Sequence, residues 1–166
     1  EPLVDLSAEL FLPNINLIEQ ADPSRLRFAA EAGIRSPEVS ALVRDLELPT
    51  GVGMFGTAVQ RAELVVTGDY RHDKRFRHSR VTDRIVRVAN MRSFAVAPLV
   101  AEGEVLGGLG AYSTRADDFD EGELALLRAL ADHAAAAIRN TRLIERLNRS
   151  QEQLAHSVEA QRTLTE

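Results

Sequence analysis

The sequence predicts an α+β domain with an antiparallel sheet, followed by a long C-terminal helix. Apolar and polar residues alternate over short segments, as they do in half-buried strands. The two clearest pairs of such segments are separated by turns of hairpin length. A helical pattern then runs from about Asp120 to the end of the chain. Strands joined by hairpins favour an antiparallel sheet over alternating parallel units.

The first expected elements form a hairpin. Residues 11–19 and 26–32 have strand character, and the turn-forming sequence Asp22-Pro23-Ser24 lies between them. Ser36 and Pro37 then predict the start of a short helix, because serine favours the N-cap and proline the first helical position. The remaining extended segments of this half are residues 46–49 and 64–67.

The two strongest strand candidates are residues 93–100 and 105–113, joined by a glycine-containing turn. Apolar residues of both parities in the first segment predict a strand that is buried on both faces. The second segment contains Gly107, Gly108 and Gly110. Glycine weakens a strand, so three glycines predict a bulge or a close approach by a ligand or a neighbouring backbone.

Positive charge is concentrated in the basic segment, Arg71–Arg92. It has eight Arg and Lys residues against two Asp, so it carries +6 and leaves −11 for the rest of a chain of net charge −5. A charge run of this kind is usually a solvated helical surface. The alternative is an electropositive lid over an anion-binding cavity. The segment lacks interleaved aromatic residues and DNA-binding motifs, so we expect no nucleic-acid partner.

The composition excludes several kinds of site. The chain has no cysteine, which removes disulfides, thiolate metal sites and cysteine nucleophiles. His72 and His78 are too far apart in sequence for a metal-binding pair on one helical turn. We therefore predict no catalytic residues and no metal site. No apolar run approaches the roughly 20 residues of a membrane span, and we expect a cytoplasmic protein.

The C-terminal helix changes its pattern near Arg139. Before that point its apolar face suits packing on a sheet. After it, apolar and glutamine residues recur at coiled-coil spacing. We predict a homodimer, most simply parallel, through this seam; the alternative is an exposed tail. The predicted dimer and signalling residues are Ile144, Leu147, Gln151, Leu154 and Val158.

Five short motifs together resemble those of the GAF domain family. Residues 49–58 read P-T-G-V-G-M-F-G-T-A, which is similar to the family's P-x-G-x-G-x-x-G-x-A turn. Residues 92–99, R-S-F-A-V-A-P-L, resemble its R-S-x-x-x-x-P-L strand. The sequence A-I-R-N-T-R-L at 137–143 resembles its exit helix. The other two matches are Val66–Tyr70 and Glu104–Leu109.

The resemblance implies a small-molecule sensor with a central antiparallel sheet and a ligand cavity under a helical lid, here the basic segment. It implies a GAF-like domain over residues 1–143, with its first helix cut short. Residues 144–166 would form a coiled-coil-like signalling helix or linker toward a downstream output domain outside this sequence. The candidate pocket residues are Asp69, Tyr70, Arg92, Phe94, Val96, Gly108, Leu109 and Tyr112. Arg92 is the best candidate to bind an anionic small molecule.

The same resemblance bears on cofactors. Bilin attachment and the free methionine sulfoxide reductase activity of this family need cysteine, and haem binding needs a histidine that residues 83–90 lack. The signature of cyclic-nucleotide binding is also broken. We therefore expect no haem, bilin or other cofactor, and a non-enzymatic sensing domain of a signalling protein such as a sensor histidine kinase. The alternative is a structural dimerisation module with an empty cavity.

Overall fold

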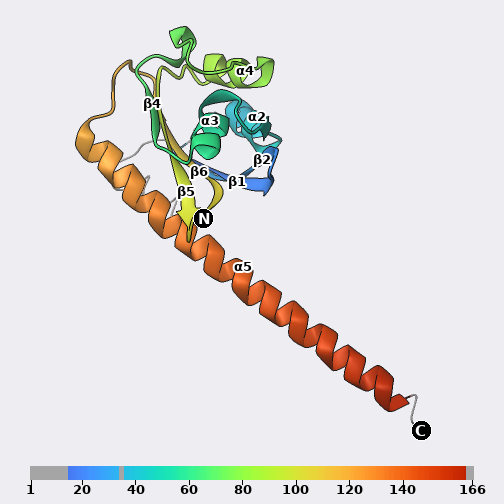
Figure 1. Cartoon of the computed structure of the whole chain (residues 1–166). Coiled ribbons are helices and arrows are strands. Elements are labelled where there is room, and N and C mark those ends of the chain that lie inside the picture. Colours follow the sequence, from blue (N-terminus) through green and yellow to red (C-terminus); the bar gives the residue numbers. More distant parts are fainter. Residues whose placement is uncertain (1–14, 34–35, 164–166) are drawn as a thin grey trace.

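The structure is a computed structural model that describes residues 15–33 and 36–163. Over these residues, six strands form one antiparallel sheet in the order β3-β2-β1-β6-β5-β4, with helices on both faces (Figure 1). The predicted α+β class and antiparallel sheet are confirmed. The strands are β1 (Ile15–Asp22), β2 (Arg25–Ala32), β3 (Glu47–Pro49), β4 (Val65–Thr67), β5 (Ser93–Ala101) and β6 (Glu104–Ser113).

Two helices, α2 (Pro37–Arg44) and α5 (Glu121–Thr163), begin where the sequence predicts them. The Ser36 hydroxyl accepts a hydrogen bond from the Val39 backbone N–H, as an N-cap should. At the start of the long helix, Asp120 and Glu123 each accept a hydrogen bond from the other's backbone N–H, a reciprocal capping arrangement. The helices are α2 (Pro37–Arg44), α3 (Gly53–Arg61), the short 3₁₀ helix η1 (Tyr70–His72), α4 (Arg80–Val88) and α5 (Glu121–Thr163).

The strand limits differ slightly from those predicted. The strand expected at 11–19 is observed as β1, and residues 11–14 lie outside the described residues. The turn between β5 and β6 consists of Glu102 and Gly103, with φ angles of 49° and 80°. Two consecutive left-handed residues give the turn whose twist matches that of the flanking strands.

One helix was not predicted. The glycine-rich turn at 49–58 continues into α3, whose N-cap residue Val52 makes no side-chain capping bond. The turn closes through a hydrogen bond from the Gly51 N–H to the Gly56 carbonyl. A Cβ atom on Gly56 would lie 2.7 Å from the Pro49 carbonyl oxygen, so this position requires glycine. Such a helix start has no local side-chain signal.

The sheet separates two apolar cores. On one face, the α5 residues Leu127, Ala131 and Ala135 pack against Leu99 and Leu109 of the sheet. On the other face, α2, α3 and α4 cover residues such as Ile18, Phe94 and Val96. The helical face predicted to pack on a sheet is therefore the one that α5 buries.

The long helix continues far beyond the sheet (Figure 1). It has 43 residues, and at about 1.5 Å per residue it is roughly 65 Å long. Nη1 and Nη2 of Arg139 donate to Oε1 and Oε2 of Glu102, each at 2.6 Å. This pair of bonds attaches the helix to the β5–β6 turn. Every side chain from Leu143 to Ser157 is exposed. In the described part of the chain, no helix combines the length and apolar character needed to cross a membrane.

Candidate ligand-binding site

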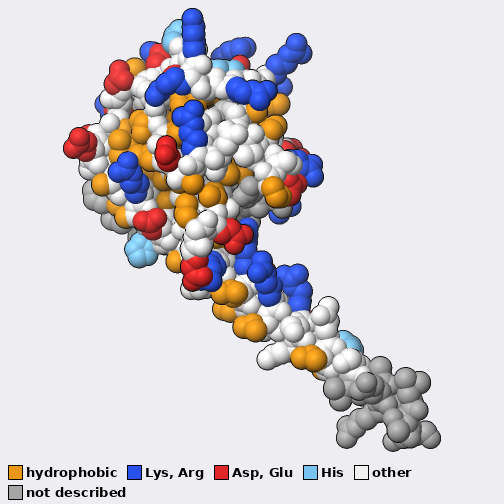
Figure 2. Space-filling view, in the orientation of Figure 1, with side chains coloured by type: hydrophobic (Ala, Val, Ile, Leu, Met, Phe, Trp, Pro, Cys, Tyr) orange, Lys and Arg blue, Asp and Glu red, His pale blue; other side chains and the backbone are white. Residues whose placement is uncertain are grey.

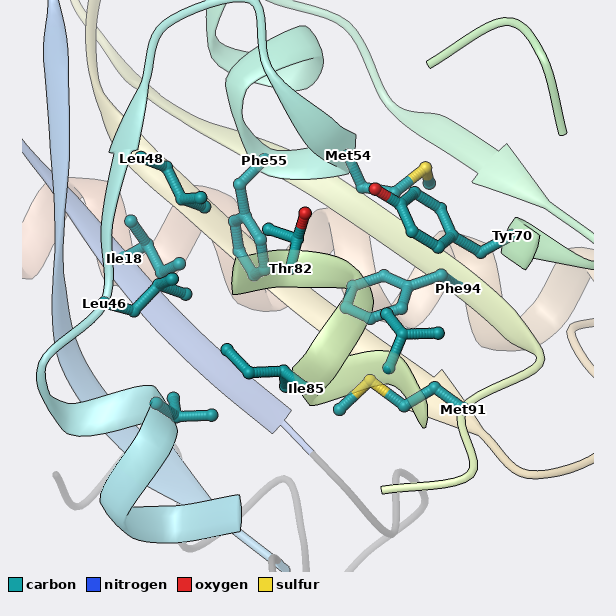
Figure 3. A pocket seen from close by; sticks show the side chains of 12 residues that line it. Ile18, Leu46, Leu48, Met54, Phe55, Tyr70, Thr82, Ile85, Met91 and Phe94 are labelled. Carbon is teal, nitrogen blue, oxygen red and sulfur yellow. The ribbon is translucent and has the colours of Figure 1, made fainter. Parts of the chain in front are cut away.

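A cavity of about 50 Å³ lies between α4 and the sheet (Figure 3). This volume exceeds the roughly 10–15 Å³ that one water molecule requires on the same measure, so the cavity can hold a small organic group. Side chains from both layers point into it. The lining residues are Ile18, Val43, Leu46, Leu48, Met54, Phe55, Tyr70, Thr82, Ile85, Val86, Met91 and Phe94.

The cavity wall is almost wholly apolar. Of its side chains, only Tyr70 and Thr82 carry oxygen, and none carries nitrogen. The Thr82 hydroxyl is occupied by the backbone N–H and hydroxyl of Ser79, with which it caps α4. Burial raises the pKa of Tyr70, so its phenol stays neutral at physiological pH. An uncharged, apolar group fits these surroundings.

Loop contacts hold α4 over the cavity. The Gly53 N–H at the start of α3 donates to the Arg77 carbonyl at 2.8 Å. The Asp73 carboxylate accepts from the Thr67 hydroxyl at 2.7 Å and from the Arg75 guanidinium. The Arg75 hydrogen bonds are the largest cause of the low pKa of Asp73, which therefore stays ionised. These bonds attach the loop before α4 to both α3 and β4.

A histidine contacts both this loop and α4. The imidazole of His78 lies 2.8 Å from the Asp83 carboxylate and 3.3 Å from the Asp73 carbonyl. Its ring is stacked at a tilt on Tyr70, with 4.6 Å between centroids. Burial lowers the pKa of His78, but the hydrogen bonds to Asp83 and Asp73 outweigh burial and raise it overall.

The structure brings together some of the predicted pocket residues. Tyr70 and Phe94 line the cavity. Tyr112 stacks on Phe94, with 6.0 Å between ring centroids, and lies behind the cavity wall. Val96 is buried on the same face, beside the Phe55 ring and Gly108. Burial, with a smaller contribution from the charge of Glu31, raises the pKa of Tyr112 to about 12.

Three expectations about the pocket need correction. Leu109 lies on the opposite face of the sheet, in the core with α5, because successive residues of a strand point to opposite faces. Arg92 lies outside the cavity and binds Asp69, with 2.7 Å between Nη2 and Oδ2. These hydrogen bonds are the main cause of the lowered pKa of Asp69. Neither residue of this pair lines the cavity.

The sequence predicted that the glycines of β6 mark a bulge or a close approach by a ligand or a backbone. The β5–β6 register shifts directly beside Gly107, as a bulge would cause, whereas Gly108 and Gly110 accommodate a side chain. A Cβ atom on Gly108 would lie 3.0 Å from the Phe55 ring, and one on Gly110 would lie 2.4 Å from it. The space that these glycines leave is therefore filled by Phe55. Enlarging residue 108 would therefore press on this ring, which is itself part of the cavity wall.

The basic segment points its charges toward solvent. Figure 2 shows Lys and Arg side chains gathered at the end of the molecule that carries α4. The segment is partly helical, as predicted: it contains part of η1 and all of α4. On α4, Arg80, Arg84 and Arg87 are exposed, while Ile85 and Val86 face the cavity.

Most of the cavity residues were not predicted from the sequence. Met54 and Phe55 lie in the helix that was not predicted. Ile85 and Val86 lie in α4, within the basic segment, whose sequence predicted a solvated surface or a charged lid. The amphipathic spacing of Thr82 with these two residues was the available signal. Within the described residues, no group of three His, Cys, Asp or Glu residues could hold a metal ion.

Comparisons with known proteins agree with this architecture. The sequence profile of the GAF domain matches residues 15–139. No curated protein sequence matches the chain. The GAF domain of a phosphoenolpyruvate-protein phosphotransferase from Coxiella burnetii is 24% identical, with a TM-score of 0.68 over 84% of this chain and 79% of that one.

Two further solved structures are similar. The GAF domain of a two-component sensor histidine kinase from Bacillus halodurans is 17% identical, with a TM-score of 0.70 over 87% of this chain and 93% of that one. A type II free methionine-R-sulfoxide reductase from Thermoplasma acidophilum is 18% identical, with a TM-score of 0.61 over 81% of this chain and 85% of that one. At these identities the likeness establishes a shared fold, which regulatory domains and an enzyme both use.

Proposed function

The chain belongs to the GAF domain family, and on this premise we propose that it is a non-enzymatic sensing domain of a larger cytoplasmic signalling protein, such as a sensor histidine kinase. A small molecule with an apolar buried part binds in the cavity under α4. The bound state is transmitted through α5 to a downstream output domain. Two copies of the chain pair through the exposed part of that helix.

The observation that carries this proposal is the cavity itself. It is lined by apolar side chains, lies beneath a helix attached by loop contacts, and has no charged group in its wall. An apolar ligand gains roughly 25 cal/mol for each Å² of apolar surface that it buries there. The chain has no cysteine, and Tyr70 is the one titratable residue in the cavity wall. These features favour binding over catalysis.

The position of α5 supports the signalling part of the proposal. Phe94 contacts the cavity from β5, while its neighbours Ala95 and Ala97 pack against α5 on the opposite face of the same strand. A ligand that shifts β5 would therefore shift the helix. The seam has Ile144, Gln151 and Val158 at one heptad position and leucines at the other. Among parallel coiled coils, β-branched residues at the first position and leucine at the second favour two strands.

Native mass spectrometry of the chain purified from its source cell tests the proposal. We expect a retained small molecule, and we expect Val43→Phe to abolish its retention because Val43 lines the cavity on α2. Leu42→Phe is the matched control, since Leu42 is on the same helix and does not line the cavity. A protein that carries no small molecule and is unaffected by Val43→Phe would instead favour a structural dimerisation module.

A further inference from the structure

We propose that the ligand of this cavity is a small amphiphilic carboxylic acid. Its apolar part lies in the cavity, and its carboxylate lies just outside, between the guanidinium groups of Arg71 and Arg87. This inference rests on the proposed function and adds the chemical class of the ligand. The observation that carries it is a second concavity that shares part of its wall with the cavity.

The second concavity, here called the outer hollow, measures about 410 Å³ and opens to solvent. Tyr70 and Val86 line both the outer hollow and the cavity. These two side chains thus belong to the wall between the two spaces, and a ligand that occupies both has to displace the buried Tyr70 ring. The lining residues of the outer hollow are Tyr70, Arg71, His78, Asp83, Val86 and Arg87.

Two arginines, Arg71 and Arg87, line this hollow. Arg71 Nη2 donates to the Asn90 side-chain oxygen at 3.0 Å, which holds Arg71 beside the C-terminal end of α4. Arg87 lies in the last turn of the same helix. Arginine presents a planar fork of N–H donors, and two such forks suit the two oxygens of a carboxylate.

The neighbouring acidic side chains do not neutralise these arginines. Asp83 lies 2.8 Å from the His78 imidazole, and Asp69 binds Arg92 at 2.7 Å. Among the described residues, neither Arg71 nor Arg87 forms an ion pair, and the guanidinium of Arg71 donates to an uncharged amide, that of Asn90. The outer hollow therefore presents two arginines without an acidic partner next to the apolar cavity, together with the Asp83–His78 pair. That combination selects a molecule that is apolar at one end and acidic at the other.

Isothermal titration of the full chain with matched pairs of probes tests this class. The acids are benzoate, phenylacetate, isovalerate and hexanoate, and each is compared with its own amide, which has the same shape without the charge. For at least one pair, we expect the acid to bind about tenfold or more tightly than the amide, as a charge-assisted hydrogen bond provides. Salt should reduce this preference, because the arginines are exposed.

Variants of the arginines localise the effect. Arg71→Gln and Arg87→Gln should each weaken binding of the acid toward that of the amide, and leave amide binding unchanged. Arg84→Gln is the matched control, because Arg84 is exposed on the same helix and does not line the outer hollow. The inference is overturned if acids and amides bind equally, a result that leaves the proposed function standing. It is also overturned if Arg84→Gln weakens acid binding as much. If no probe binds, the inference about the ligand class fails, and native mass spectrometry decides separately whether the proposed function stands.

Discussion

The ring of Phe55 occupies the space that a side chain on Gly110 would need. A Cβ atom at residue 110 would lie 2.4 Å from Cζ of Phe55, which is far inside van der Waals contact. The absence of a side chain at this position lets a ring from α3 lie against β6 and form part of the cavity wall. Packing of the Phe55 ring therefore explains Gly108 and Gly110 of β6.

We expect Gly110→Ala to destabilise the domain, because the new methyl group must displace a buried aromatic ring. Over-packing of this kind costs about 1–3 kcal/mol. Gly108→Ala is the graded comparison, since its nearest contact would be 3.0 Å, and it should cost less. Urea unfolding of both variants measures the difference. Equal stability of Gly110→Ala and the unmodified chain would contradict the assigned packing.

Replacing Leu147 by Ser should weaken self-association of the chain. The Leu147 side chain is 63% exposed in the single chain, and a second helix would bury it in the predicted seam. Burying a leucine contributes about 1.5–3 kcal/mol, so the dissociation constant of a dimer should rise more than tenfold. Sedimentation equilibrium of the full chain measures this constant.

Asn148→Ser is the control for the seam, because residue 148 is also exposed and is not one of the predicted seam residues. It should leave association nearly unchanged, and both variants should unfold at the same temperature. An unmodified chain that stays monomeric at all accessible concentrations would exclude the homodimer. Equal weakening by the two variants would place the interface elsewhere.

Elements with local signals were predictable from the sequence, and contacts between distant residues were not. Ser36 and Asp120 mark helix starts through hydrogen bonds within one turn, and these signals were correct. The partner of Arg92 is 23 residues away at Asp69, and no local pattern indicates it. The face on which Leu109 lies depends on strand register, and a one-residue difference in alternation reverses it.

The cavity follows the same division. Tyr70 and Phe94, which line the cavity, lie within family motifs of the sequence. Met54 and Phe55 lie in α3, a helix that no side-chain cap marks in the sequence. The charge of the basic segment drew the sequence interpretation toward an anion held by Arg92. Folding places these charges outside and the apolar side chains of the same helix inside. The charge pattern of the sequence thus indicated the exposed face of α4, whereas the cavity residues on its buried face became evident only from the packed structure.

The chain should bind neither haem nor bilin. Covalent bilin attachment needs a cysteine, and the chain has none. Haem titration followed by absorption spectroscopy is the measurement, and we expect only the spectrum of free haem. His72→Ala and His78→Ala test whether either histidine ligates haem. A Soret band at equimolar haem that either substitution removes would show this expectation to be wrong.

The His78–Asp83 contact should make stability depend on pH. The pKa of His78 in the folded chain is raised above its ordinary value of 6.5, so protonation favours the folded state. This contribution is fully present below about pH 6.5 and is lost as the pH rises through the raised pKa. We therefore expect His78→Gln to lower the unfolding temperature more at about pH 5.5 than at about pH 8.5.

A double-mutant cycle with Asp83→Asn isolates the cause of that dependence. The groups that face His78 are the Asp83 carboxylate from α4, the Asp73 carbonyl and charge from the preceding loop, and the Tyr70 ring. Without the Asp83 charge, His78→Gln should lower the unfolding temperature by nearly the same amount at both pH values, apart from the smaller effect of Asp73. If, in the Asp83→Asn background, the loss of unfolding temperature caused by His78→Gln still falls as strongly with rising pH, a group other than Asp83 governs this pH dependence. If the unmodified background shows no fall at all, the imidazolium does not stabilise α4 over the cavity.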